Sequence, residues 1–170
     1  AIGEGFLPEV CSDWEGASAN LPDEVRHVYL RSGIVLSGTG GALGKMLLPF
    51  KMGAGGPMGN GKQWMSWISL DDEIYAIHHL LMETGSEGVY NLTAPNPVRQ
   101  KGFAKTLGRV LRRPAFAPLP GFVIKILFGE MGVKLTLESQ KVLPNRLLEE
   151  GYEFLHPDLE TALQDTLGLW

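Results

Sequence analysis

Two glycine-rich stretches are the parts of this sequence best suited to holding a ligand. The first, G-T-G-G at residues 38–41, follows an apolar run and precedes a helical pattern, which is the setting of a dinucleotide-binding loop. Its spacing does not fit, because the third glycine position falls on Leu43 and nothing acidic occurs between Glu24 and Asp71 to bind a ribose. The G-K-M at residues 44–46 also lacks the Ser or Thr that ends a phosphate-binding loop. We therefore expect a loop beside a ligand and no self-contained nucleotide fingerprint.

Polar side chains accompany both glycine loops, the second of which, G-A-G-G-P-M-G-N-G, spans residues 53–61. Glycines let the backbone approach a ligand closely, and ligands of open α/β sheets sit at the carboxyl ends of parallel strands. The side chains that could bond a phosphate there are Lys45, Lys51, Lys62 and Gln63. Each of them alone also fits a solvated surface position, so both interpretations stay open.

Side chains for acid–base, nucleophilic or metal chemistry are sparse. His78 and His79 are consecutive on a predicted helix and point about 100° apart, so they cannot chelate one metal together. His78 falls on an apolar stripe, which predicts a core histidine. Cys11 has no histidine nearby in the sequence and is predicted to be a small buried hydrophobic residue. Asp71 and Asp72 fit the start of a helix better than an acid pair. We predict no catalytic residue and no metal site.

Alternating strand and helix signals surround these loops in the first hundred residues. Apolar runs predict strands at residues 25–30, 32–37, 64–70 and 89–93. Three- and four-residue spacing predicts helices at residues 7–20, 43–52, 73–84 and 98–113. The stripe of the third helix expected to face the core is Ile74, Ile77, His78 and Leu81. Such alternation is typical of parallel βαβ units.

After Pro114 the pattern becomes nearly all helical. The predicted helices cover residues 121–128, 134–142, 143–151 and 157–167. We expect them to form a helical cap over one edge or end of the sheet. The sequence thus predicts an α/β part at residues 1–113 and a small helical domain at residues 114–170.

Composition limits the classes of partner. The net charge of -4 gives no reason to expect nucleic acid or an anionic membrane. A single cysteine cannot form a disulfide within the chain, which fits a reducing compartment. No apolar run reaches the roughly 18 residues that cross a bilayer. We expect a cytoplasmic protein, or an organelle stroma or matrix protein that has lost its transit peptide, with a small molecule as its partner.

Six stretches, in order along nearly the whole chain, resemble one family. They are F-L-P-E-V-C-S-D-W-E (6–15), L-R-S-G-I-V-L (30–36), G-G-A-L-G-K-M-L-L-P-F (40–50), W-M-S-W-I-S-L-D-D (64–72), Y-N-L-T-A-P-N-P (90–97) and Q-K-V-L-P-N-R (140–146). The fourth and fifth are the most specific. Together they are similar to the epimerase family proteins described as cell-division-inhibitor-like. That group is an atypical branch of the extended short-chain dehydrogenases/reductases, in the NAD-dependent epimerase/dehydratase superfamily.

This resemblance implies the fold class. Residues 1–113 would be the C-terminal part of a Rossmann-like α/β domain, and residues 114–170 a mostly helical C-terminal subdomain. The glycine fingerprint that binds NAD or NADP would belong to an N-terminal Rossmann half absent from this sequence. Catalytic members use Tyr-x-x-x-Lys, in which the lysine lowers the tyrosine pKa. Alignment on Glu15 places Leu7 at the tyrosine position and Cys11 at the lysine position, so this sequence departs from the catalytic pattern.

The resemblance also implies binding roles. The segment beside the nicotinamide would comprise Arg31, Gly33, Ile34, Val35 and Leu36. The substrate side would comprise Lys45, Met46, Phe50, Gln63, Trp64, Trp67 and Asp71. A tryptophan or methionine at strand spacing fits the core as well as a pocket. For these side chains, a place in the core and a place in a binding pocket therefore both stay open.

Two functions follow from the resemblance. The first is the substrate-side part of an NAD(P)-dependent epimerase, dehydratase or reductase that acts on a nucleotide-linked sugar or similar small molecule. The second is a non-catalytic NAD(P)-binding regulatory or interaction protein, which the departure from the Tyr/Lys pattern favours. A purely structural α/β domain is a third, weaker interpretation. For this chain alone we expect no bound NAD or NADP and no activity.

Overall fold

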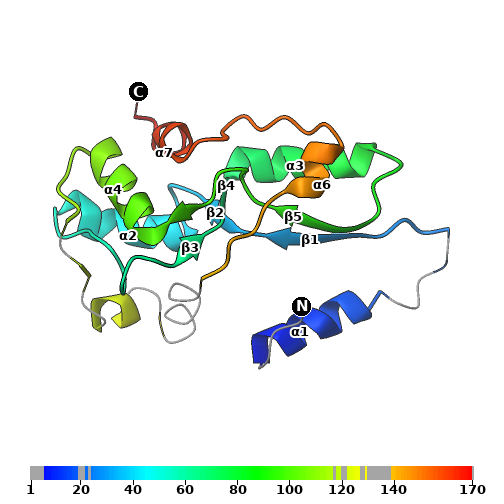
Figure 1. The fold of residues 1–170 in the computed structure, drawn as a ribbon, viewed down its shortest axis with the longest axis horizontal. Helices are drawn as coiled ribbons and strands as arrows, with labels where there is room; N and C mark the ends of the chain where they lie inside the picture. Colours follow the sequence, from blue (N-terminus) through cyan, green and yellow to red (C-terminus); the bar gives the residue numbers. More distant parts are fainter. Residues whose placement is uncertain are drawn as a thin grey trace.

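Helices flank short pairs of strands in the computed structural model, which describes residues 6–18, 22, 24–116, 118–119, 122–126, 129 and 139–169. Figure 1 shows α3, α6 and α7 on one side of the strands and α1 on the other. This arrangement confirms the predicted α/β class. Among the described residues, no helix is both long and apolar enough to span a bilayer.

Three two-stranded ladders account for the named strands of the described residues. β1 (Val28–Ser32) pairs with β5 (Gly88–Leu92) and β2 (Ile34–Leu36) with β4 (Trp67–Ser69), both in parallel. β3 (Trp64–Met65) pairs antiparallel with β6 (Val98–Arg99). The two longer ladders confirm the parallel pairing expected from the alternating pattern. The strand predicted over 64–70 is split at Ser66, because its two halves pair with different strands.

The two parallel ladders meet at Gly33. Its N–H donates to the Leu92 carbonyl at 2.9 Å, and the next N–H, of Ile34, donates to the Ser66 carbonyl at 2.9 Å. The chain therefore leaves β5 and takes up β4 within two residues. A Cβ at position 33 would lie 2.7 Å from the Ser66 carbonyl oxygen and 2.9 Å from Thr93 Cγ2, so this crossing requires glycine.

Residues 139–142 lie across this junction. The Ser66 hydroxyl donates to the Gln140 carbonyl at 2.9 Å and accepts the Val142 N–H at 2.9 Å. The helix predicted here from the sequence is wrong for these four residues, because their backbone bonds to the strands instead of to itself. Residues 134–138 of the same prediction lie outside the described residues.

The helices keep close to their predicted ranges, with shifted ends. They are α1 (Phe6–Gly16), α2 (Gly41–Lys51), α3 (Leu70–Met82), α4 (Gln100–Val110), α6 (Asn145–Glu149) and α7 (Leu159–Leu167). Residues 122–126 are helical as well. α4 begins two residues late because β6 precedes it, and α6 is short because Pro144 precedes it and Gly151, with φ 81°, follows it. The strand predicted at 25–30 begins at Val28.

The buried face of α3 differs from the prediction. Asp72, Ala76 and Leu80 are buried, whereas Ile74, His78 and Leu81 are exposed. Apolar residues occur on two faces of this helix, so periodicity alone cannot select the one that packs on the strands. The predicted core histidine at position 78 is therefore wrong.

One apolar core draws on both predicted domains. Leu36, Met46, Phe50 and Phe103 of the first hundred residues pack in one cluster with Leu163 of α7. A second cluster joins residues of α3, β4 and β5 to α6 and the segment after it. The helical C-terminal part thus completes the core of the α/β part, while the boundary at residues 113 and 114 stays a prediction.

Candidate functional site

Arg31, at the carboxyl end of β1, joins that strand to α1. Its guanidinium donates twice to Glu15, from Nε to Oε1 and from Nη2 to Oε2, each at 2.7 Å. These hydrogen bonds lower the pKa of Glu15 and raise that of Arg31. Of the other residues predicted beside the nicotinamide, Gly33 forms the ladder junction and Leu36 is fully buried. Ile34 and Val35 are half-buried.

Glu73 carries a buried carboxylate oxygen close to the same strand end. Its Oε1 accepts the Ser32 hydroxyl at 2.5 Å, and its Oε2 is buried without a hydrogen-bond partner among the described residues. Burial raises the pKa of Glu73. Sequence reasoning missed this residue, because an acidic residue in the first turn of a helix is ordinary.

Two cationic side chains lie over the ring of Trp64. The Arg99 guanidinium carbon lies 3.9 Å from its ring centroid and the Lys141 Nζ lies 4.9 Å from it. In the described part of the chain, neither cation has a carboxylate within salt-bridge distance. The segment carrying Lys141 is held here by the Trp64 N–H, which donates to Ser139 Oγ at 3.0 Å. An exposed pair of cations beside an aromatic ring can bind an anionic ligand and stack on a planar group.

The remaining residues predicted on the substrate side do not gather around Trp64 as exposed groups. Met46, Phe50 and Trp67 are fully buried in the core, and Gln63 is 6% exposed. Lys45 is exposed on α2. Their binding roles stay predictions, and four of the five have structural roles in this chain.

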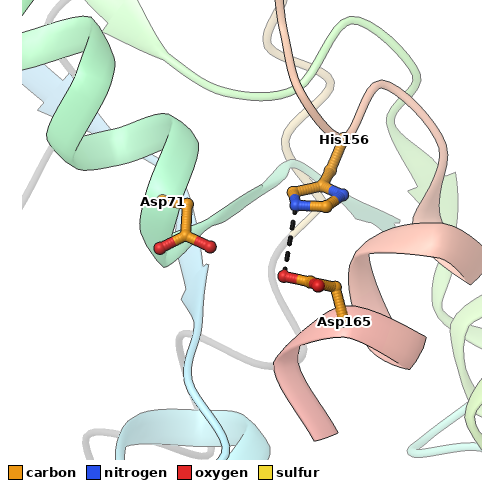
Figure 2. Close-up of side chains that lie close together, drawn as sticks. All are labelled: Asp71, His156 and Asp165. Carbon is orange, nitrogen blue, oxygen red and sulfur yellow. Dashed lines mark ion pairs between the residues drawn. The ribbon is translucent and has the colours of Figure 1, made fainter. Parts of the chain in front are cut away.

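Asp71 lies with His156 and Asp165, as Figure 2 shows. The His156 Nε2 and Asp165 Oδ2 atoms are 3.3 Å apart. One donor atom of each of the three residues lies within 4.8 Å of the other two. Sequence reasoning named Asp71 alone, because its partners follow more than eighty residues later and no sequence spacing connects them.

Cys11 is exposed on α1, so the prediction of a buried thiol is wrong. α1 is attached through its C-terminal end, where Glu15 bonds Arg31 and the Ser18 hydroxyl lies 2.7 Å from that of Tyr29. The first turns of the helix therefore leave Cys11 outside the core. α1 contains neither a tyrosine nor a lysine.

Sequence comparison finds close relatives over nearly the whole chain. The epimerase family protein SDR39U1 homolog, chloroplastic, of Arabidopsis thaliana is 46% identical over 95% of this chain and 46% of its own length. The human epimerase family protein SDR39U1 is 44% identical over 96% of this chain and 56% of its own. The epimerase family protein YfhF of Bacillus subtilis is 39% identical over 97% of this chain and 54% of its own length. Residues 119–166 also match a family described as a domain of unknown function, DUF1731.

Solved structures agree with these matches. The structure of human SDR39U1 (isoform 2) with NADPH matches 97% of this chain and 56% of its own, with a TM-score of 0.90 and 40% identity. The structure of a nucleoside-diphosphate sugar epimerase from Corynebacterium glutamicum matches 98% of this chain and 32% of its own, with a TM-score of 0.74 and 30% identity. The UDP-glucose 4-epimerase of Thermus thermophilus, in complex with NAD, shares the fold at 17% identity and a TM-score of 0.61. This chain is therefore a homologue of the epimerase family proteins, with an extended short-chain dehydrogenase/reductase fold, and it spans about half the length of the curated relatives it matches.

Proposed function

We propose that this chain is the substrate-side part of an NAD(P)-dependent, epimerase-like protein that acts on a nucleotide-linked sugar or a similar small molecule. The observation that carries the proposal is the match to human SDR39U1, whose structure contains NADPH, over 97% of this chain at a TM-score of 0.90. Because this chain covers 56% of that structure, the remaining cofactor contacts are expected from further polypeptide.

The residues proposed beside the nicotinamide are Arg31, Gly33, Ile34, Val35 and Leu36. We expect them to contact the cofactor without binding its phosphates, because the glycine spacing at residues 38–44 does not fit a dinucleotide fingerprint. The loop at 37–41 packs against α7. A Cβ at Gly38 would lie 2.9 Å from the carbonyl oxygen of Thr166 in that helix. A nicotinamide cofactor would supply hydride transfer. This chain would help to orient the nicotinamide ring, and the proposed N-terminal Rossmann half would bind the pyrophosphate of the cofactor.

An N-terminal Rossmann half is the partner we propose for the β1 side of the structure. Among the described residues, β1 pairs only with β5 and so keeps one open edge. Ser32 of β1 is hydrogen-bonded to Glu73 of α3. The same helix exposes Leu70, Ile74 and Tyr75. An added parallel strand with its helix would pair the edge and cover these apolar side chains.

The substrate-binding groups we propose are Trp64, Arg99 and Lys141. The other residues that we propose on the substrate side are Lys45, Met46, Phe50, Gln63, Trp67 and Asp71. Two cations over the Trp64 ring, without carboxylate partners in the described part of the chain, suit a diphosphate. This set of side chains favours a nucleotide-linked substrate over a neutral sugar.

Calorimetric titration of the full-length protein with UDP-glucose tests the substrate side. Arg99→Ala should weaken binding by about tenfold, since a hydrogen bond to a charged group is worth about 1.5–3 kcal/mol. Trp64→Ala should weaken it as well. Lys105→Ala, which removes an exposed cation of α4, is the matched control and should bind like the wild type. Equal affinity of all four proteins would refute the proposed substrate site.

Fluorescence titration with NADPH tests whether cofactor binding requires the proposed N-terminal half. This chain alone should show no binding above background, and binding should appear when the cofactor-binding half of a relative is added or fused in front of it. Micromolar affinity of this chain alone would contradict the proposal, because the chain would then hold a complete dinucleotide site.

A non-catalytic NAD(P)-binding regulator, of the cell-division-inhibitor-like kind, is the second candidate function. The observation that favours it is α1, which carries no tyrosine or lysine for proton transfer. Turnover of a panel of nucleotide sugars by the full-length protein decides between the two: cofactor binding without turnover of any sugar supports the regulator. For either function we propose a cytoplasmic location or an organelle stroma or matrix.

A further inference from the structure

Two parts of the chain more than eighty residues apart bring one imidazole and two carboxylates together. Asp71 is in the first turn of α3, His156 lies in the segment before α7, and Asp165 is on α7 (Figure 2). The His156 Nε2 to Asp165 Oδ2 distance is 3.3 Å. One donor atom from each residue lies within 4.8 Å of the other two. His156 is largely buried, with 14% of its side chain exposed, whereas Asp71 faces solvent.

The neighbouring Asp72 holds this arrangement in place. Its side chain is fully buried and accepts the backbone N–H groups of Leu155 at 2.8 Å and His156 at 3.0 Å. Because Asp71 and Asp72 are consecutive, these bonds set the position of His156 relative to Asp71. Leu163, packed in the core, fixes the helix that carries Asp165. The three side chains thus come from fixed backbone, which is the supporting structure a metal site needs.

We propose that Asp71, His156 and Asp165 bind a divalent first-row transition metal ion such as Zn²⁺. Two carboxylates balance the charge of the ion, and the imidazole favours zinc over magnesium or calcium. With bonds of about 2.0–2.2 Å, ligands of tetrahedral zinc lie about 3.4 Å apart, close to the spacing of His156 and Asp165. Since the three ligand atoms lie within 4.8 Å of one another, the exposed Asp71 carboxylate needs to approach by no more than about 1.4 Å. Water completes the coordination on the solvent side.

This site shares Asp71 with the residues predicted on the substrate side, but it involves neither Trp64 nor the two cations beside that ring. Sequence analysis predicted no metal site, since it considered only ligands related by short spacing. The bound ion connects the start of α3 to α7 and so stabilises the attachment of the C-terminal helix.

Zinc titration of the chelator-treated, full-length protein by calorimetry tests the site. We expect one ion per chain, and at least a tenfold loss of affinity in Asp71→Asn, His156→Gln and Asp165→Asn. His78→Gln and Asp13→Asn remove an exposed histidine and an exposed aspartate elsewhere and should bind zinc like the wild type. Co²⁺ in place of zinc should give the visible absorption of a tetrahedral site, lost in the three ligand variants.

Thermal unfolding makes the outcome clear even where a variant is less stable. Zinc should raise the melting temperature of the wild type and of both controls, and leave that of the ligand variants unchanged. Wild-type zinc affinity in Asp71→Asn would overturn the three-ligand site and leave an ordinary ion pair between His156 and Asp165. Absence of zinc binding to the wild type would overturn it outright.

Discussion

Asp71 and Asp72 are adjacent residues with opposite environments. Asp71 is exposed, while Asp72 is fully buried and accepts the Ser69 hydroxyl at 2.8 Å together with two backbone N–H groups of the segment before α7. The Tyr152 hydroxyl also donates to the Asp72 carbonyl oxygen at 3.0 Å. One side chain therefore both holds Ser69, the N-cap of α3, and attaches a segment more than eighty residues away.

Replacing Asp72 with alanine should lower the free energy of unfolding by about 3 kcal/mol, because buried donors lose their acceptor. Urea denaturation measures the change. Asp71→Ala, tested in the presence of a chelator, is the adjacent control and should change stability by no more than about 0.5 kcal/mol. Equal effects of the two substitutions would show that Asp72 does not attach the C-terminal segment.

Glu73 should make stability depend on pH in a definite direction. Its pKa is raised by burial from the ordinary 4.5, so the folded state holds the proton more tightly than the unfolded state does. The stability that protonated Glu73 contributes is full below its unfolded pKa and is lost as pH rises through the folded pKa. The unfolding free energy of the wild type, relative to Glu73→Gln, should therefore fall between about pH 4 and pH 7.

Urea denaturation of both proteins at the two pH values measures this difference. Glu15 and Glu150, whose pKa values are lowered, titrate in both proteins and cancel in the comparison. A wild-type-to-variant difference that stays constant with pH would mean that Glu73 has the same pKa in the folded and unfolded states.

At the scale of elements, periodicity in the sequence predicted most helices and strands, but not which strands pair or which helix face packs in the core. The apolar run at 64–70 predicts one strand, and only tertiary structure shows that Ser66 divides it between β6 and β2. On α3, apolar residues on two faces left the buried face undecided. Residues 139–142, the described part of the helix predicted at 134–142, are not helical, because bonds to Ser66 outweigh a local apolar pattern.

Gly33 offers a test of the junction between ladders. Gly33→Ala should lower the free energy of unfolding by about 1–3 kcal/mol, because its Cβ would press on a backbone oxygen that cannot move aside. Gly102→Ala is the matched control, since a Cβ there meets nothing within 4 Å and alanine favours the helix by about 0.5–1 kcal/mol. Chemical denaturation of both variants should show shifts of opposite sign.

Over the whole molecule, the candidate sites were the least predictable feature. The sequence pointed to Trp64 and Asp71, but the partners that give them chemistry, Arg99 with Lys141 and His156 with Asp165, come from distant segments. Only folding brings these residues together. The similarity to a family supplied the fold class correctly, because that likeness extends along nearly the whole chain.

The shared core predicts that the chain unfolds as one unit. Leu163 of α7 is fully buried against residues of the first hundred. Leu163→Ala should lower the free energy of unfolding by about 2–5 kcal/mol and shift a single transition. Leu48→Ala, on the exposed side of α2, should have little effect. Two separate transitions in calorimetry would instead show that residues 114–170 unfold independently.

The hydrogen bonds between Ser66 and the backbone at Gln140 and Val142 span 74 and 76 positions of the sequence. During synthesis on the ribosome, the ladder junction is made long before the residues that bond across it. Until residues 139–142 leave the exit tunnel, Ser66 must bond to water or to a chaperone. The emergence of residues 139–142 from the tunnel is therefore the event that closes this junction, and a nascent chain arrested before residue 139 should stay sensitive to proteolysis.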